Sequence, residues 1–489
     1  MPTSPPLRPT LLGTVAPWVG YLALALLGLH LLGDYLPDDA FIHFRYARNL
    51  AAGEGWGYNP GDPSNAGATS PLWVLLLAAA SSVLGSVPRA ADVFLVVALT
   101  VAGGATFAAL RAVGRPAAGV VSGTFVTTAP LLLATRGMES PLYVALAATA
   151  WWAAARHRQV AAGLALGALT LVRGDGLAVA AGVGLWWLVR DRVLPWRMIG
   201  AAIAPVAAWL AYATVVFGDP VPGTLAAKMA QGDSGYWGEG PLFVKGLWEL
   251  PRAFGMDAWA LALVGLGVTG AVTLIPRAAR PARRLLGGAL LAAVLLVLTY
   301  GPVLGVPAYH WYYALPVLVI GLAAGLPIGF AAEQAAELVG DRAPGPARAG
   351  GVVLLACSLG IVVLVVYGGL RVTPGVFPTP HYVAAAEFIQ ARAAPGTSVA
   401  LTEIGAFGWA GEDLVVVDYL GLLDGQAAEH LAGGDLAWWL GAYEPDWWVV
   451  HEPAWGFEQP ALATVAFEAY EQVPDDIPEL AFYRRRPAA

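Results

Sequence analysis

Two adjacent carboxylates stand directly after the first long apolar run of the chain. Asp38 and Asp39 follow Pro37, and Ile42 and Tyr46 repeat behind them at the four-residue spacing of a helix. A carboxylate beside apolar walls can hold a raised proton affinity and act as a general base toward a hydroxyl group. Asp38 is the first candidate for this base and Asp39 the second. The plainer alternative is that the pair only caps a helix, because carboxylates favour the positive end of the helix dipole.

Other polar and aromatic side chains follow in the same segment, Asp34–Trp73, which we expect to begin with an amphipathic helix lying on a membrane surface. Asp39 and His43 are four residues apart and share a helix face, so they are candidate ligands for a divalent metal ion. No further metal ligand or cofactor is indicated. The candidate substrate-binding residues in this segment are His43, Arg45, Tyr58 and Asn59.

Charged and aromatic residues also gather at the ends of later apolar runs. Arginines stand two or three residues before carboxylates in Arg136–Ser140 and Arg173–Gly176, where local ion pairing is the alternative to function. The only two lysines, Lys228 and Lys245, fall in the loop after residue 217, and a cation near the membrane suits a phosphate leaving group. The aromatic rings and the imidazole of Tyr309–Tyr313 could hold a sugar or a phosphate; the alternative is that they form an aromatic belt at the membrane interface. The candidates for binding a phosphate are Lys228, Arg136, Arg173 and His310, and those for binding substrate are Glu139, Asp175 and Tyr309.

The composition places these side chains on a membrane protein. Of the 489 residues, 58% are hydrophobic and 12% charged, with a mean hydropathy of +0.63. The net charge is −7 and no tract is rich in lysine or arginine, so nothing indicates nucleic-acid binding. Cys357 is the only cysteine, so any outward domain depends on core packing.

The arginines decide the predicted topology. If residues 69–85 lie in the outer leaflet without crossing, alternation from a cytoplasmic N-terminus at Arg8 puts every dense arginine cluster, including Arg277 and Arg342, on the cytoplasmic side. Polar residues that would be costly in lipid then face outward. The eleven predicted spans lie near residues 11–32, 90–110, 117–135, 140–156, 159–172, 176–189, 198–217, 257–276, 285–303, 312–331 and 350–370.

The chain is therefore predicted to have a transmembrane domain, residues 1–376, with a first extracytoplasmic loop at 33–89 that carries juxtamembrane helices. Residues 377–489 change to alternating helix and strand signals and predict a small extracytoplasmic α/β domain. Its short, mostly buried strands are expected at Ser398–Thr402, Leu414–Val417, Trp447–Val450 and Leu480–Tyr483.

The stretch DDAFIHFRYARNLAAGEGWGYNPGD…GATSPLW resembles the first outer loop of type C glycosyltransferases, especially the mycobacterial terminal arabinofuranosyltransferases. Gly137-Met138-Glu139, Gly218-Asp219-Pro220-Val221-Pro222 with Lys228, and Glu403–Leu422 are similar to further motifs of that subgroup. Asn65–Ala68 and Gly223 depart from its pattern. The resemblance implies the type C fold, an α-helical polytopic membrane protein.

The resemblance also implies an activity: inverting transfer of a sugar, arabinofuranose in this subgroup, from a polyprenyl-phosphate donor. The aspartate at Asp38 or Asp39 would act on the reacting hydroxyl. The expected acceptor is a cell-envelope glycan, glycolipid or glycoprotein at the outer face of a bacterial inner membrane. The alternatives are a glycan ligase with a lipid-diphosphate donor, a membrane transporter, and a non-catalytic carbohydrate-binding protein.

Overall fold

The computed structural model of the chain describes residues 11–61, 67–220, 223–274, 280–339, 345–371, 379–423 and 425–487. Arg8, Arg277, Arg342, parts of two motifs (Asn65–Ala66 and Val221–Pro222) and the predicted domain boundary at 376/377 lie outside these ranges.

The first part of the described chain is helical, and the predicted spans fall on helices, with two differences. The span predicted at 117–135 is divided between two helices, Pro116–Thr127 and Pro130–Leu133, and residues 275–276 of the span at 257–276 lie outside the described ranges. The helices are α1 (Leu11–Leu31), α2 (Asp38–Ala52), α3 (Pro71–Leu84), α4 (Val87–Ala112), α5 (Pro116–Thr127), α6 (Pro130–Leu133), α7 (Ser140–Ala155), α8 (Gln159–Val172), α9 (Gly176–Asp191), α10 (Trp196–Phe217), α11 (Thr224–Asp233), α12 (Leu242–Ala253), α13 (Asp257–Leu274), α14 (Arg280–Leu298), the π-helix η1 (Thr299–Val303), the 3₁₀ helix η2 (His310–Tyr313), α15 (Ala314–Val339) and α16 (Gly345–Leu370).

Six helical stretches among the described residues are long and apolar enough to cross a membrane, so the protein is a multi-pass membrane protein. They are Gly13–Leu31, Val87–Ala112, Trp196–Phe217, Pro281–Val303, His310–Val339 and Gly345–Leu370. The helix α3 has 14 residues, which at 1.5 Å per residue is about 21 Å and short of the roughly 30 Å hydrocarbon core. The number of crossings stays a prediction.

The C-terminal region forms a five-stranded mixed sheet with the order β2-β1-β3-β5-β4, confirming the predicted small sheet domain. The strands β1, β2 and β3 are parallel, and β5 runs antiparallel between β3 and β4. The elements are α17 (Thr379–Gln390), β1 (Ser398–Leu401), α18 (Ile404–Ala410), β2 (Val415–Asp418), α19 (Gly425–Ala432), α20 (Trp438–Tyr443), β3 (Trp447–His451), α21 (Gln459–Leu462), the 3₁₀ helix η3 (Val465–Ala469), β4 (Tyr470–Val473) and β5 (Leu480–Arg485).

The strand β4 was not predicted from the sequence. Its residues are Tyr-Glu-Gln-Val at the edge of the sheet, and only Tyr470 is buried. A polar edge strand lacks the apolar run by which a buried strand is recognised. The central strand β3 is buried along its whole length, because apolar clusters pack on both of its faces.

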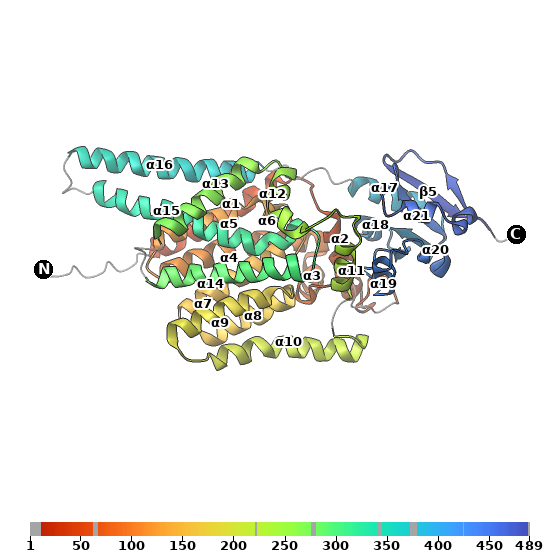
Figure 1. Cartoon of the computed structure of the whole chain (residues 1–489), viewed down its shortest axis with the longest axis horizontal. Coiled ribbons are helices and arrows are strands. Elements are labelled where there is room, and N and C mark those ends of the chain that lie inside the picture. Colours follow the sequence, from red (N-terminus) through yellow and green to blue (C-terminus); the bar gives the residue numbers. More distant parts are fainter. Residues whose placement is uncertain are drawn as a thin grey trace.

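The helical bundle and the sheet lie at opposite ends of the molecule, with α2, α3 and α11 between them (Figure 1). One apolar core joins the two parts. It includes Phe44 and Trp73 from the first outer loop, and Ile404, Phe407 and Trp447 from the C-terminal domain. The sheet domain is therefore packed directly on the first outer loop, and this seam positions the polar residues described below.

The helix α2 begins at Asp38, as the sequence predicts, and ends at Ala52; Gly53 follows as the C-cap, with a φ of 81° that suits glycine. Ten of its fifteen residues are buried. The helix α2 is therefore packed within the protein, and its position relative to a membrane surface stays a prediction. Its amphipathic face is covered by protein, since α18 of the C-terminal domain packs against it.

Candidate functional site

The two aspartates that open α2 point to different neighbours. Consecutive helix residues are about 100° apart around the axis, so adjacent side chains leave the helix on different faces. Asp38 is buried, whereas Asp39 is only half-buried. One face of α2 meets α18 of the C-terminal domain, and the other is close enough to Glu139, just before α7, and Lys228, on α11, for their charges to act on Asp39.

Asp38 caps a helix of the C-terminal domain. Its carboxylate oxygens accept hydrogen bonds from the backbone N–H groups of Gly405, at 2.8 Å, and Ala406, at 2.7 Å, in the first turn of α18. Glu403, the residue before α18, makes no side-chain cap of its own. Burial raises the pKa of Asp38 to about 7, against the opposing effect of the two amide hydrogen bonds. A Cβ atom at Gly405 would collide with the Asp38 carbonyl oxygen, so this close approach requires glycine.

Arg45 continues the same contact. Its guanidinium is 0% exposed and donates to the carbonyl oxygens of Tyr58 at 2.8 Å, Gly408 at 2.6 Å and Leu414 at 2.8 Å. The Tyr58 hydroxyl donates to the Ile404 carbonyl at 2.5 Å. These bonds run from the first outer loop to α18 and the residues that follow it.

Asn59 completes this set by pairing with a strand edge. Its side-chain amide accepts from the Val416 N–H at 3.0 Å and donates to the Val416 carbonyl at 2.9 Å. We call Asp38, Arg45, Tyr58 and Asn59 the clamp. Arg45, Tyr58 and Asn59 were predicted to bind substrate, and the structure gives their polar groups partners in the protein backbone.

Asp39 lies among charged and aromatic groups from several elements. Burial raises the pKa of Asp39; the charges of Lys228 and His43 oppose this shift and that of Glu139 adds to it. The Asp39 carboxylate in turn raises the pKa of the Tyr309 hydroxyl, which burial already raises. We call Asp39, His43, Glu139, Lys228 and Tyr309 the Asp39 cluster. All five were predicted from the sequence, and the fold brings them together from α2, α11 and the residues just before α7 and η2.

Lys228 contributes the positive charge of the cluster. It lies on α11, is 7% exposed, and its Nζ is 4.0 Å from the centre of the Tyr309 ring. Among the described residues no carboxylate oxygen lies within 4.0 Å of this ammonium. A buried cation without a close counter-ion is costly, so it is suited to receive an anionic group.

His43 and Glu139 carry buried atoms that have no hydrogen-bond partner among the residues that the structure describes. Both ring nitrogens of His43 and the Oε2 of Glu139 are in this state. Burial lowers the pKa of His43, which favours its neutral ring. Buried polar atoms are normally satisfied, so three such atoms beside Asp39 indicate a place where a polar ligand or water completes the bonding.

Arg173 holds Glu139 in place. Its guanidinium pairs with Glu139 at 3.1 Å and with Asp175 at 2.8 Å, and it donates to the Trp311 carbonyl at 3.2 Å. The guanidinium also lies over the ring of Tyr312, 5.0 Å from its centre. Arg173 and Asp175 thus form a buried ion-pair network that supports the cluster.

Arg136 and His310, the other two candidates for binding a phosphate, have partners outside the Asp39 cluster. Arg136 makes a two-point ion pair with Asp92, at 2.7 and 2.9 Å, and donates to the Gly33 carbonyl at 2.5 Å. His310 is buried, with its Nε2 3.3 Å from the Ala134 carbonyl oxygen. Lys228 is therefore the predicted phosphate ligand with the least satisfied charge.

Two acidic residues of the C-terminal domain face the same region and were not assigned a role from the sequence. Glu403 is half-buried. Burial and the charges of Asp38 and Asp39 raise its pKa, and the charge of Lys228 opposes this shift. Asp418 is buried, and its carboxylate accepts hydrogen bonds from the N–H groups of Leu420 and Leu423. Burial raises the pKa of Asp418, and these hydrogen bonds and the charge of Lys228 oppose the shift. Glu403 follows β1, and Asp418 is the last residue of β2; the two strands are parallel. Ligands of α/β sheets gather at the carboxyl ends of strands, and this position was the signal that could have identified them.

The described residues contain no group of three or more histidine, cysteine, aspartate or glutamate side chains that could hold a metal ion. The prediction of a metal at Asp39 and His43 rests on those two side chains. The two free ring nitrogens of His43 leave it able to act as a ligand.

Comparisons with other proteins bear on the fold. Residues 377–485 match the family model of a domain of unknown function (DUF8728). No curated protein matches the sequence. Among solved structures, ArnT from Cupriavidus metallidurans bound to undecaprenyl phosphate matches with a TM-score of 0.59 and 15% identity, covering 98% of this chain and 99% of ArnT.

Two other solved structures match over most of this chain. The Archaeoglobus fulgidus oligosaccharyltransferase has a TM-score of 0.55 and 12% identity over 93% of this chain and 73% of its own. The mycobacterial arabinofuranosyltransferase AftD has a TM-score of 0.51 and 14% identity, and its match covers 96% of this chain but 41% of AftD. The chain therefore has the fold of type C glycosyltransferases.

Proposed function

We propose that the protein is a membrane glycosyltransferase that moves a sugar from a polyprenyl-phosphate donor to a hydroxyl group of a cell-envelope glycan, glycolipid or glycoprotein. The observation that carries this proposal is that a half-buried carboxylate, Asp39, and a buried ammonium, Lys228, share one site, while no carboxylate oxygen of the described residues lies within 4.0 Å of that ammonium. The fold shared with ArnT, solved with undecaprenyl phosphate, supports the choice of donor.

Asp39, and not Asp38, is the proposed base. Both oxygens of Asp38 already accept hydrogen bonds from α18. Asp39 is partly accessible, and its raised pKa brings its proton affinity nearer to neutral pH, which suits a general base. Asp39 takes the proton of the acceptor hydroxyl while that oxygen forms a bond to the anomeric carbon. The bond from this carbon to the phosphate oxygen breaks in the same step.

The leaving polyprenyl phosphate carries a negative charge that Lys228 stabilises. His43 and the free oxygen of Glu139 then hydrogen-bond the hydroxyl groups of the bound sugars. A base and a leaving-group ligand on different helices, α2 and α11, suit attack from opposite sides of the anomeric carbon. We therefore propose that the transfer inverts the stereochemistry.

An apolar cavity offers a place for the isoprenoid chain of the donor. It has a volume of about 550 Å³ and lies between α8, α9 and α10. Its lining includes Thr170 and Leu177, which flank Arg173 and Asp175 in the chain, and Leu210 of α10. Thr170 and Leu177 are close in the chain to Arg173 and Asp175, so a tail in this cavity would approach the ion-pair network that holds Glu139.

The first outer loop resembles that of terminal arabinofuranosyltransferases, so we propose arabinofuranose as the transferred sugar. The ends of α9 and α15 and the starts of α10 and α16 lie at the end of the bundle away from the sheet (Figure 1). Arg190, Arg192 and Arg197 stand at the α9–α10 junction. The positive-inside rule then supports an outward-facing C-terminal domain in a bacterial inner membrane.

A ligase acting on a lipid diphosphate is the second candidate, because the oligosaccharyltransferase from Archaeoglobus fulgidus shares the fold. A diphosphate calls for more positive charge than a monophosphate. Arg136 and Arg173 are neutralised by Asp92, Glu139 and Asp175. This favours the monophosphate donor.

The test is transfer of labelled sugar from matched polyprenyl-phosphate and polyprenyl-diphosphate donors to cell-envelope glycan acceptors by the purified full chain, with and without a chelator. Transfer from the monophosphate donors supports the proposal. Transfer only from diphosphate donors would establish the ligase, and no transfer from either would reject both. Loss of transfer with chelator would establish a metal requirement.

A further inference from the structure

Four aromatic rings gather where the loop after α11 meets the loop after β3. Trp237 stacks on Phe457, with the ring centres 5.2 Å apart and the ring planes 7° from parallel. The Phe457 ring in turn contacts that of Trp455 edge to face, with the ring centres 5.6 Å apart. Tyr236 packs beside Gly456, since a Cβ atom added to this glycine would lie 3.4 Å from the Tyr236 ring. We call Tyr236, Trp237, Trp455 and Phe457 the aromatic platform.

Two rings of the platform are exposed to solvent. Trp455 is 39% exposed and Tyr236 is 46% exposed, although both side chains are large and mostly apolar. Trp237 and Phe457 are half-buried and pack on a small core that also contains Ala230 of α11. The half-buried rings thus anchor the exposed ones to the protein. Exposed aromatic surface of this kind marks a binding site, because a ligand that covers it removes apolar area from water.

Trp455 is held in place by a buried hydrogen-bonded network. Its ring stacks on that of His451, with the ring centres 3.4 Å apart. The Tyr382 hydroxyl lies 2.8 Å from His451 Nε2, and Glu458 Oε1 lies 2.8 Å from His451 Nδ1, so both ring nitrogens have partners. The other oxygen of Glu458 accepts a hydrogen bond from the backbone N–H of Trp455 at 2.8 Å. A ring that is fixed before binding loses little conformational entropy when a ligand stacks on it.

The platform is connected to the Asp39 cluster through α11. Lys228 and Gln231 are three residues apart on this helix, and the Gln231 side chain accepts a hydrogen bond from the Tyr309 hydroxyl at 3.0 Å. The chain then runs from the end of α11 directly to Trp237. Chain geometry limits the distance between the Cα atoms of Lys228 and Trp237 to at most about 22 Å. A short oligosaccharide spans such a distance, so one acceptor chain can reach both places.

The charged residues beside the platform are mostly acidic. Asp233 and Glu239 flank its first two rings in the chain, Glu452 precedes its third, and all three side chains are exposed. The cation Lys245, whose Nζ bonds the Glu239 carbonyl, is a single positive charge against these three carboxylates. Carboxylates accept hydrogen bonds from hydroxyl groups and repel anions. This surface therefore suits a neutral, polyhydroxylated ligand and disfavours an acidic polymer or an anionic lipid headgroup.

We propose that the aromatic platform is a second acceptor subsite, where sugar units that do not react stack on Tyr236 and Trp455 while the end of the same glycan lies at Asp39. This rests on the proposed function and names the acceptor class, a neutral oligosaccharide or polysaccharide. The C–H face of a sugar ring packs on an aromatic ring, and the hydroxyl groups at its rim stay free to bond carboxylates. Binding at the platform raises the effective concentration of a long acceptor at the reaction site.

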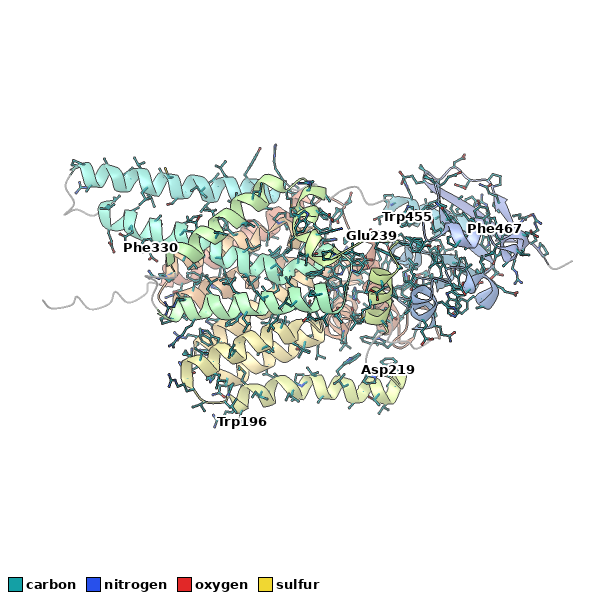
Figure 2. The ribbon with its side chains drawn as sticks, viewed as in Figure 1. Trp196, Asp219, Glu239, Phe330, Trp455 and Phe467 are labelled. Atoms are coloured by element: carbon teal, nitrogen blue, oxygen red, sulfur yellow. The ribbon has the colours of Figure 1, made fainter. Side chains whose placement is uncertain are left out.

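The test measures binding of linear neutral oligosaccharides of arabinose and of mannose, from disaccharide to octasaccharide, to the purified full chain by titration calorimetry. Trp455→Ala and Tyr236→Ala should each weaken octasaccharide binding about 5-fold, the scale of one lost aromatic contact, whereas Trp455→Phe should keep most of the affinity. Trp196→Ala is the matched control. This tryptophan is 68% exposed at the start of α10, and Figure 2 shows it at the end of the bundle away from Trp455. The control should bind as the wild type does.

The acceptor KM in the transfer assay is a second readout. A disaccharide acceptor is expected to fill the reaction site alone, so Trp455→Ala should leave its KM unchanged. The same variant should raise the KM of an octasaccharide acceptor about 5-fold and leave kcat unchanged, because the lost contact is remote from the reacting hydroxyl. A ring that only packs the domain would lower Tm without this dependence on acceptor length.

Wild-type affinity for the octasaccharide in folded Trp455→Ala and Tyr236→Ala would overturn the proposal, as would an equal loss of affinity in Trp196→Ala. Tyr236→Ala decides alone if Trp455→Ala does not fold. An octamer of galacturonate, an acidic sugar, that binds as tightly as the neutral octasaccharides would overturn the acceptor class. Absence of transfer by the wild type, with binding that depends on the platform, would instead reject the proposed function.

Discussion

The two faces of α2 differ in what their polar groups have to bind. On the clamp face, Asp38 and Arg45 are buried and their hydrogen bonds are made by backbone groups of the C-terminal domain. On the face of the Asp39 cluster, Asp39 is half-buried and both nitrogens of His43 lack partners. Satisfied polar groups hold a structure together, whereas unsatisfied ones leave bonding capacity for a ligand. The two neighbouring aspartates therefore differ in role: Asp38 binds the C-terminal domain, and Asp39 stays available to a ligand.

The largest effect that sharpens this comparison is expected at Lys228. Lys228→Gln removes the charge that would stabilise the leaving phosphate and should lower kcat about 100-fold, the scale on which loss of one preorganised electrostatic group slows an enzyme. Steady-state transfer assays with a polyprenyl-phosphate donor measure it. Lys245→Gln is the matched control, because the Lys245 Nζ bonds the Glu239 carbonyl on an exposed loop. Equal loss in both variants would contradict a specific role for Lys228.

The clamp can be broken at Arg45. Arg45→Met leaves the carbonyl oxygens of Gly408 and Leu414 without their donor and should destabilise the docking of the C-terminal domain by about 3 kcal/mol. Limited proteolysis and thermal unfolding report this change. Arg48→Met, three residues further along α2, removes a partly exposed ion pair with Glu412, a hydrogen bond to the Trp409 carbonyl and the contact with the Trp409 ring, and should cost less, about 1 kcal/mol. If the two variants unfold alike, Arg45 is not a principal part of the clamp.

The pH dependence of transfer probes Asp39. The base must be ionised, and its pKa is raised by burial, so kcat/KM should fall as pH drops through a value above the ordinary 3.8 of an aspartate. A pH series at saturating and limiting acceptor measures this acid limb. An acid limb at or below the ordinary aspartate value would argue against a buried carboxylate as the base.

The smallest effect is expected at Tyr58. Tyr58→Phe removes the hydroxyl that donates to the Ile404 carbonyl and should lower stability by about 1 kcal/mol while leaving kcat unchanged. Chemical denaturation and the transfer assay give the two numbers. A large loss of kcat without loss of stability would instead support the prediction from the sequence that Tyr58 binds substrate.

The helices were predictable from the sequence because apolar runs and their boundary residues are local signals. The start of α2 at Asp38 is one example, and the predicted span 159–172 coincides with α8. The members of the Asp39 cluster could also be predicted from the sequence, because charged residues at the ends of apolar runs are costly in lipid and therefore mark outer loops. Their grouping around Asp39 depended on the folding of distant segments.

The clamp could not be predicted from the sequence. Asp38 and Ala406 are 368 positions apart, and Arg45 and Leu414 are 369 apart. The periodicity of α2 shows that one face is covered, but lipid and protein leave the same apolar pattern. Arg45, Tyr58 and Asn59 therefore looked like ligand-binding residues. No role was assigned to Glu403 from the sequence, because the position of α18 against α2 leaves no local signal in the sequence.

The measurement that tests the difference between the two faces most directly is a side-by-side assay of Asp39→Asn and Asp38→Asn for sugar transfer and thermal unfolding. Loss of the base should lower turnover of Asp39→Asn about 100-fold or more with little change in Tm. Asp38→Asn keeps only one of the two side-chain oxygens that accept hydrogen bonds from the N–H groups of α18, so it should lower Tm and keep more activity than Asp39→Asn. Wild-type turnover in Asp39→Asn, with turnover abolished in a stably folded Asp38→Asn, would contradict the account.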